Sequence, residues 1–180
     1  SSCFPSGTYV QCALVLQLPR YAERLGAALA ALFPDVLAEA VISPALGGLI
    51  IAQEVARALP APPGTPGGCP ALFVERDASG MLALRRGFSL RSGQRVLVIE
   101  DVWTTGGSTL EAIHVVEEAG GRVVAAGALI DRSGGRIEFP VPSEALIELP
   151  MESYPPGECP LCLEGGVPEK PGSRFVPAVR

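Results

Sequence analysis

The sequence predicts an α/β fold built on a mainly parallel sheet with helices on its faces. Two segments carry this prediction, because each begins with an apolar run of strand length, turns at a pair of glycines and continues as a helical pattern. The first spans Ala40–Leu59 with its turn at Gly47-Gly48, and the second starts at Val96 and turns at Gly106-Gly107. This order is typical of strands buried on both faces of a parallel sheet. Such sheets bind ligands beyond the carboxyl ends of their strands, so we expect the functional residues there.

Length and composition indicate one domain. At 180 residues, with 48% hydrophobic and 18% charged residues, the chain can form one well-buried α/β core and is short for two, so we expect a single domain over residues 1–180. No apolar run approaches a membrane span and no basic, then apolar leader is present, so we expect a cytoplasmic protein without a membrane partner. The net charge of −5 argues against nucleic acid as the main partner.

The remaining segments continue the alternation of strands and helices. We expect an amphipathic helix over Leu18–Phe33, strands over Ala40–Ala45, Ala71–Glu75, Arg122–Ile130 and Ala145–Leu149, and, after the central turn, a helix that buries Ala112, Val115, Val116 and Ala119. His114 falls on the opposite face of that helix, which favours a surface position over a catalytic one. Residues Pro60–Pro70 hold five prolines and three glycines and are expected to form a loop. From Pro150 onward we expect an irregular tail.

An arginine-bearing segment in the middle of the chain has two interpretations. Met81–Phe88 contains Arg85-Arg86-Gly87, and it can form a hairpin or a mobile flap. An exposed hairpin with solvated charges fits the residues as well as a flap that contacts a ligand.

The segment Val96–Ser108 is the most specific functional signal. Its apolar run leads into Glu100-Asp101, followed by Thr104, Thr105, the two glycines and Ser108. Glycines allow positive φ and close approach of a ligand, and successive amides at the start of a helix form a set of N–H donors suited to phosphate. The threonine and serine hydroxyls add donors.

The two acids of this segment require a different kind of ligand group. Glu100 and Asp101 repel phosphate, and they suit sugar hydroxyls or a divalent metal instead. A phosphorylated sugar would satisfy both halves of the site, whereas a tight turn with two solvated acids and no ligand is the plain alternative. Ser108 and Glu111 also have the spacing of a capping box, which makes Ser108 the expected N-cap.

The five cysteines do not indicate a disulfide framework or a metal site. Cys159 and Cys162 form a Cys-Pro-Leu-Cys pair, but a zinc site needs about four ligands, and His114 with distant cysteines is a poor supply. We expect a structural or oxidisable pair and no metal held by protein ligands alone. The only lysine, Lys170, lies in the tail, which excludes a lysine-bearing P-loop, and no Gly-x-Gly-x-x-Gly segment opens a helix.

The apolar strand, paired acids and Thr/Gly/Ser loop resemble the phosphoribosyl-diphosphate (PRPP) motif of the type I phosphoribosyltransferases. Within that family, the chain most resembles the orotate phosphoribosyltransferases, over most of its length and including the Cys-Pro-Leu-Cys tail. The resemblance implies the type I phosphoribosyltransferase fold, with a central mainly parallel sheet flanked by helices, a small hood and a flexible flap. It implies a hood and base-binding segment at residues 1–17, where Thr8 and Tyr9 match an aromatic pair, and a C-terminal tail at 150–180.

The same resemblance implies roles for individual residues. Arg76 and Asp101 would be catalytic, and Arg132 with Thr104 would contact orotate, whose carboxylate a guanidinium can grip. The residues implied in PRPP binding are Glu100, Asp101, Val102, Trp103, Thr104, Thr105, Gly106, Gly107, Ser108 and Arg76. The flap departs from the family, because Glu75–Gly80 is short and lacks lysine and histidine; Arg76, with Arg85 and Arg86 behind it, is the stand-in.

The activity implied by the resemblance is transfer of the phosphoribosyl group of PRPP to orotate, giving orotidine 5′-monophosphate and pyrophosphate in the synthesis of UMP. The implied cofactor is Mg²⁺ and the implied assembly is a homodimer. Two alternatives remain at this level: a non-catalytic PRPP-binding regulatory protein on the same fold, suggested by the lysine-poor flap, and a purine phosphoribosyltransferase, against which Arg132 argues.

Overall fold

The computed structural model describes residues 6–152, 154 and 157–166. The chain divides into two compact units, one formed by Gln11–Pro150 and the other by Ser1–Val10 with Met151–Arg180. The first unit contains, in chain order, α1 (Ala13–Leu16), α2 (Pro19–Ala30), β1 (Ala40–Pro44), α3 (Leu49–Ala58), β2 (Ala71–Arg76), β3 (Leu82–Leu84), β4 (Arg95–Trp103), α4 (Gly107–Glu118), β5 (Arg122–Asp131) and β6 (Ser143–Glu148). The second contains α5 (Pro160–Leu163). The single domain over residues 1–180 stays a prediction.

The strands form a six-stranded sheet in the order β3-β2-β1-β4-β5-β6. Every neighbouring pair is parallel except β2 and β3, which form an antiparallel hairpin. The predicted mainly parallel sheet is therefore confirmed, and the arginine-bearing segment is a hairpin at its edge. The chain order reverses between β1 and β4, which are adjacent although β2 and β3 lie between them in sequence, so this sheet has its switch point there.

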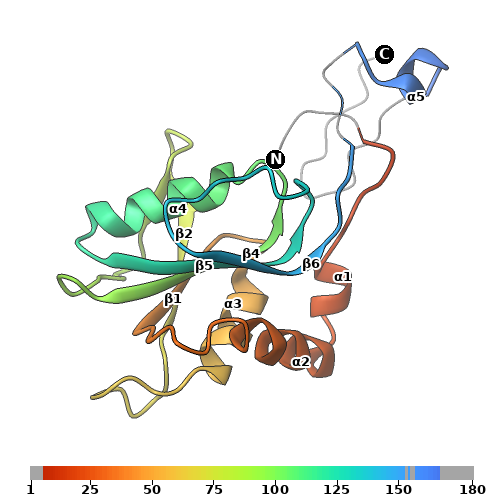
Figure 1. Cartoon of the computed structure of the whole chain (residues 1–180). Helices are drawn as coiled ribbons and strands as arrows, with labels where there is room; N and C mark the ends of the chain where they lie inside the picture. The colour runs from red at the N-terminus through yellow and green to blue at the C-terminus, as the bar shows by residue number, and fades with distance from the viewer. Residues whose placement is uncertain (1–5, 153, 155–156, 167–180) are drawn as a thin grey trace. The chain divides into compact units, whose positions relative to one another are not determined.

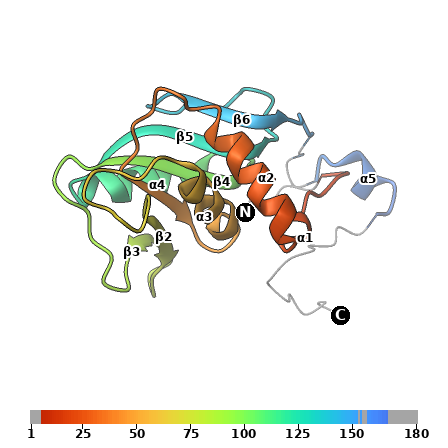
Figure 2. The same cartoon turned by 90° about the horizontal axis from the view of Figure 1, so that it is seen from below.

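Helices cover both faces of the sheet. Figures 1 and 2 show α4 on one face and α2 with α3 on the other. Because both faces are covered, the middle of β4 is an uninterrupted apolar run, and its residues Val96, Leu97, Val98 and Ile99 are each 0% exposed. A surface strand would instead alternate apolar and polar residues.

Two predicted details differ from the structure. β4 does not end at the acids but continues through them to Trp103, because its ladder with β5 extends to Trp103 and Asp131. In α4, the predicted buried residue Ala119 is exposed, because the helix ends at Glu118 and Gly120 turns the chain away with positive φ. The predicted burial of Ala112 and Val116 is confirmed, Val115 is half-buried, and Thr109 and Ile113 complete the buried face of α4.

No helix among residues 6–152, 154 and 157–166 has the length and apolar character that a membrane crossing requires.

The contact between α2 and α3 supplies a test of this packing. Gly26 is buried where α2 crosses α3, and an added Cβ would clash with the Cβ of Glu54 and lie 2.7 Å from its carbonyl carbon. We predict that Gly26→Ala lowers the free energy of unfolding by about 1–3 kcal/mol, since backbone must move to admit the methyl group. The matched control is Gly67→Ala, because nothing lies within 4 Å of a Cβ there. Urea denaturation in which both variants match the original protein would contradict the described helix contact.

Candidate active site

The turn between β4 and α4 is set by Gly106. Its φ of +74° places it in the left-handed region, and its carbonyl accepts the first helical hydrogen bond from the Leu110 amide at 2.9 Å. Gly106 is therefore the N-cap of α4, and the prediction that Ser108 is the N-cap is wrong. The left-handed glycine starts the helix at Gly107, so Ser108 already lies in its first turn.

A segment after β5 covers this turn. A Cβ at Gly106 would lie 2.6 Å from Cγ2 of Ile137 and 3.2 Å from the ring of Phe139. The same ring packs against Trp103, with the ring centroids 4.7 Å apart. Trp103 is 3% exposed, so it supports the turn from beneath rather than facing solvent.

Glu100 is connected to the turn by a short chain of hydrogen bonds. The Trp103 indole donates to Oγ1 of Thr109 at 3.0 Å, and the Thr109 hydroxyl donates to the Glu100 carboxylate. Burial raises the pKa of Glu100 from 4.5 to about 7, although the hydrogen bond from Thr109 opposes this shift and the charge of Asp101 adds to it. The Glu100 carboxyl is thus held in one orientation and is easily protonated near neutral pH.

Asp101 lies against the second glycine turn. A Cβ at Gly47 would be 2.7 Å from both carboxylate oxygens of Asp101, and one at Gly48 would be 3.1 Å from the carbonyl oxygen of Ile99. The turns that follow β1 and β4 therefore meet at the carboxyl edge of the sheet, at its switch point, and this edge is called the rim below. Burial also raises the pKa of Asp101 above its ordinary value.

The end of β5 adds an arginine to this rim. The Arg132 amide donates to the carbonyl of Trp103 at 2.9 Å, which places Arg132 beside the strand that leads into Thr104. Asp131 does not face the site as a free acid, because its oxygens accept from the amides of Ser133 at 2.7 Å and Gly135 at 3.3 Å. These bonds fix the loop that follows Arg132.

The three arginines of the β2–β3 hairpin segment, Arg76, Arg85 and Arg86, are each paired with an acid in this structure. Arg76 donates two hydrogen bonds to Glu111 of α4, at 3.2 and 3.1 Å, and one to the Gly80 carbonyl. Arg85 and Arg86 pair with Glu75, whose pKa the hydrogen bond from Arg86 lowers. Glu111 therefore binds the hairpin instead of reaching back to cap α4, and its other bond comes from the Leu82 amide at 2.7 Å. The role of Arg76 at a ligand stays a prediction.

The remaining predicted residues are a histidine of α4 and four residues of the second compact unit. His114 is exposed and lies 3.1 Å from Glu118, as expected for a surface residue. Thr8 and Tyr9 belong to the unit that contains the tail. In that unit Cys159 is buried, and its hydrogen bond raises the pKa of Cys162.

Sequence reasoning missed three features of the site. The chain from Trp103 through Thr109 to Glu100 could not be anticipated from spacing alone, and neither could the cover over Gly106 or the contact of Gly47 with Asp101. A partial signal was present, since Ile137 and Phe139 are apolar residues in a segment otherwise rich in glycine and charge.

The comparison with known proteins is decisive for the family. A family model for the phosphoribosyl transferase domain matches residues 21–139. The orotate phosphoribosyltransferase of Heliobacterium modesticaldum is 51% identical over 175 residues, covering 94% of this chain and 85% of that protein. The orotate phosphoribosyltransferase of Caldanaerobacter subterraneus subsp. tengcongensis is 47% identical over 169 residues, covering 94% and 84%. The chain belongs to the orotate phosphoribosyltransferase family.

Solved structures agree with this family assignment. The Mycobacterium tuberculosis H37Rv orotate phosphoribosyltransferase in complex with PRPP has a TM-score of 0.64 and 28% identity, covering 80% of this chain and 82% of that one. The adenine phosphoribosyltransferase of Thermoanaerobacter pseudethanolicus has a TM-score of 0.65 at 19% identity, covering 79% and 90%. The second likeness concerns the fold alone, which orotate and adenine phosphoribosyltransferases share.

The two glycines of the turn provide a matched test in this phosphoribosyltransferase. We predict that Gly106→Ala lowers the free energy of unfolding by about 1–3 kcal/mol, because alanine is strained at positive φ and meets Ile137. Gly107→Ala is expected to change it by less than about 0.5 kcal/mol, since its Cβ would find only Oγ1 of Thr105, at 3.6 Å. Guanidinium unfolding measures both; equal losses in the two variants would argue against the left-handed turn.

The raised pKa of Glu100 predicts a pH-dependent stability. Its folded-state pKa of about 7 exceeds the ordinary 4.5, so ionising Glu100 favours the unfolded state. This cost is absent at low pH, grows as the pH rises from about 4.5 to 7, and is complete above that. We predict that Glu100→Gln, which removes the cost, gains roughly 1–3 kcal/mol of stability relative to the original protein between pH 4.5 and 8.

Urea unfolding of both proteins across this pH range measures that difference. If the difference in unfolding free energy between Glu100→Gln and the original protein stays constant with pH, the raised pKa of Glu100 is contradicted. Glu117→Gln, on the exposed face of α4, is the control for loss of a carboxylate.

Proposed function

We propose that this chain transfers the phosphoribosyl group of PRPP to orotate, giving orotidine 5′-monophosphate and pyrophosphate. The observation that carries the proposal is the junction of β4 and α4, where two partly buried acids near the end of the strand precede a left-handed glycine and the first amides of the helix. The relatives named orotate phosphoribosyltransferase support orotate as the base that is modified. The PRPP complex of the M. tuberculosis protein supports PRPP as the donor of the sugar phosphate.

The two halves of the junction suit the two halves of PRPP. The amides of Gly107 and its neighbours at the start of α4 would donate to the 5′-phosphate, with hydroxyls of Thr104, Thr105 and Ser108 beside them. Glu100 and Asp101 would accept hydrogen bonds from the ribose hydroxyls. The raised pKa values of both acids indicate that water solvates their carboxylates poorly. Hydrogen bonds from the ribose hydroxyls would replace part of this missing solvation.

The bound sugar would react by a single displacement at C1. The N1–C1 bond forms as the bond between C1 and the pyrophosphate oxygen breaks, and the proton of orotate N1 passes to solvent. Positive charge that develops on the ribose would lie near Glu100 and Asp101, which are anionic when deprotonated, so these residues stabilise it electrostatically. The protein supplies no nucleophile in this scheme; it holds both substrates in the reacting geometry.

The acids also fit a magnesium ion that arrives with PRPP. Among the described residues there is no cluster of three His, Cys, Asp or Glu side chains that could hold a metal by itself. Magnesium commonly binds through one or two carboxylates plus substrate phosphates and water, and Glu100 and Asp101 could supply those carboxylates. When bound, Mg²⁺ would neutralise charge on the departing pyrophosphate.

A homodimer and a cytoplasmic location complete the proposal. Four apolar or aromatic side chains around α1 and the start of α2 are 46–64% exposed. They are Leu14 and Val15 of α1, Leu18 just before α2, and Tyr21 in its first turn. Exposed apolar surface of this kind often marks a protein interface. The free thiols of Cys12, Cys69, Cys159 and Cys162 suit a reducing compartment.

Pyrophosphate release tests the activity. The protein is incubated with PRPP and Mg²⁺ and with orotate, adenine or hypoxanthine in turn. Release that depends on orotate alone supports the proposal, release with a purine base favours the purine enzyme, and PRPP binding without turnover of any base favours a regulatory protein.

Arg132 should determine affinity for orotate. We predict that Arg132→Ala weakens orotate binding about 10- to 100-fold, the usual cost of losing a charged hydrogen-bond partner, and leaves PRPP affinity within about threefold. Arg136→Ala is the control, because it removes the same charge from the same loop, where Arg136 is exposed. Isothermal titration with each substrate measures the effect. Unchanged orotate affinity in Arg132→Ala would refute this role.

A further inference from the structure

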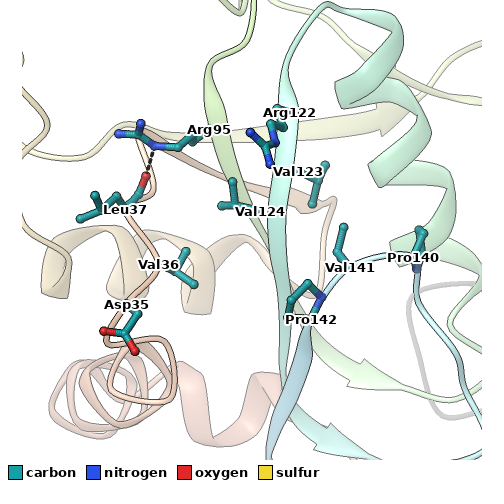
Figure 3. A pocket seen from close by; sticks show the side chains of 10 residues that line it. All are labelled: Asp35, Val36, Leu37, Arg95, Arg122, Val123, Val124, Pro140, Val141 and Pro142. Atoms are coloured by element: carbon teal, nitrogen blue, oxygen red, sulfur yellow. Dashed lines mark hydrogen bonds between the residues drawn. The ribbon is translucent and has the colours of Figure 1, made fainter.

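A groove of about 540 Å³ lies at the edge of the sheet opposite the candidate active site. It is lined by residues 35–37 between α2 and β1, by the first residues of β4 and β5, and by residues 140–142 before β6 (Figure 3). Because β4 and β5 run from this groove to the acids and Arg132, the groove is separated from the site by the length of these strands. Its volume is in the range of small-molecule sites.

Two arginines on neighbouring strands line this groove. Arg95 and Arg122 are register partners at the starts of the parallel strands β4 and β5, and both line the groove. Neighbouring strands lie about 4.8 Å apart, and like charges at facing positions of a sheet are destabilising. Two positive charges on adjacent strands favour an anion at the groove.

Among the described residues, a carboxylate pairs with Arg95 but none pairs with Arg122. The Arg95 guanidinium lies 3.9 Å from Glu39 and donates to the Leu37 carbonyl at 2.5 Å. Arg91 shares the same Glu39 carboxylate, at 3.1 Å. Within the described part of the chain, no carboxylate lies within ion-pair distance of Arg122, whose side chain is exposed. Arg122 is therefore an uncompensated positive charge at the groove of a chain whose net charge is −5.

The rest of the groove is apolar, with one acid at its far end. Val36, Val124 and Val141 are half-buried, and Pro142 adjoins them. Figure 3 shows the two arginines toward one end of the drawn side chains and Asp35 toward the other, with the valines between. An occupant would thus meet cationic donors, then apolar surface, then an acceptor.

We propose that this groove binds a nucleotide-sized phosphate monoester. The phosphate would lie on the guanidinium fork of Arg122, with Arg95 adjacent, since arginine matches phosphate geometry with paired N–H donors. The apolar or aromatic body would cover the valines, and a hydroxyl or amino group would donate to Asp35. This ligand would lie at the amino ends of β4 and β5, whereas the proposed reaction takes place at their carboxyl ends. It would therefore not displace PRPP.

The test follows the Arg122 side chain directly. Protein labelled with ¹⁵N-arginine is titrated with adenosine 5′-monophosphate, phenyl phosphate, benzoate and inorganic phosphate, and the Nε–H resonances are recorded. The control is Arg24, an exposed arginine of α2 outside the groove. We expect saturable shifts at Arg122 with the two phosphate esters, each binding at least about fivefold more tightly than inorganic phosphate or benzoate, and none at Arg24.

Two variants make the result specific. Arg122→Ala should weaken binding of phenyl phosphate, followed by its own ring proton signals, about tenfold or more, whereas Arg24→Ala should leave it unchanged. The fluorescence of Trp103, the only tryptophan in the sequence, reports separately on ligand that binds at the candidate active site. The proposal is overturned if Arg122 does not shift, if inorganic phosphate or benzoate binds as tightly as the esters, or if Arg122→Ala has no effect. None of these outcomes bears on pyrophosphate release, so the proposed reaction is tested independently.

Discussion

The left-handed turn at Gly106 is the constraint on which the rest of the site depends. It follows β4, which ends at Trp103, starts α4 one residue later and leaves the first amides of the helix at the carboxyl edge of the sheet. A side chain is excluded there both by the positive φ and by Ile137 and Phe139, which pack over the turn. The amides proposed to bind the phosphate are thus backbone groups whose positions are set by this packing.

The second constraint is electrostatic. Glu100 and Asp101 lie inside a strand rather than on a solvated loop, and burial raises both pKa values. Buried carboxylates are costly, and here the cost is only partly offset by the hydroxyl of Thr109 on Glu100. Such a pair gains more from sugar hydroxyls or a cation than solvated acids would, so the cost of burying the two acids favours the ligand proposed for them.

The order of elements was predictable from sequence because it rests on local patterns. Apolar runs and glycine turns identified β1 and β4, and the spacing of apolar residues identified α2 and α4. The details that failed depend on contacts distant in sequence. Glu111 has the spacing of a capping residue, but Arg76, 35 positions earlier, binds it. β4 passes through its two acids because β5 continues to pair with it. Likewise, the pairing of Arg95 with Arg122 arises only from register between strands.

The central claim is that main-chain amides at the start of α4 hold the sugar phosphate while the neighbouring acids hold the sugar. A crystal structure with PRPP and Mg²⁺ tests it most directly. The account predicts the 5′-phosphate oxygens at about 3 Å from amide nitrogens between Thr105 and Ser108, and the ribose hydroxyls within hydrogen-bond reach of Glu100 and Asp101. PRPP bound at another edge of the sheet, or with its phosphate held only by side chains, would contradict it.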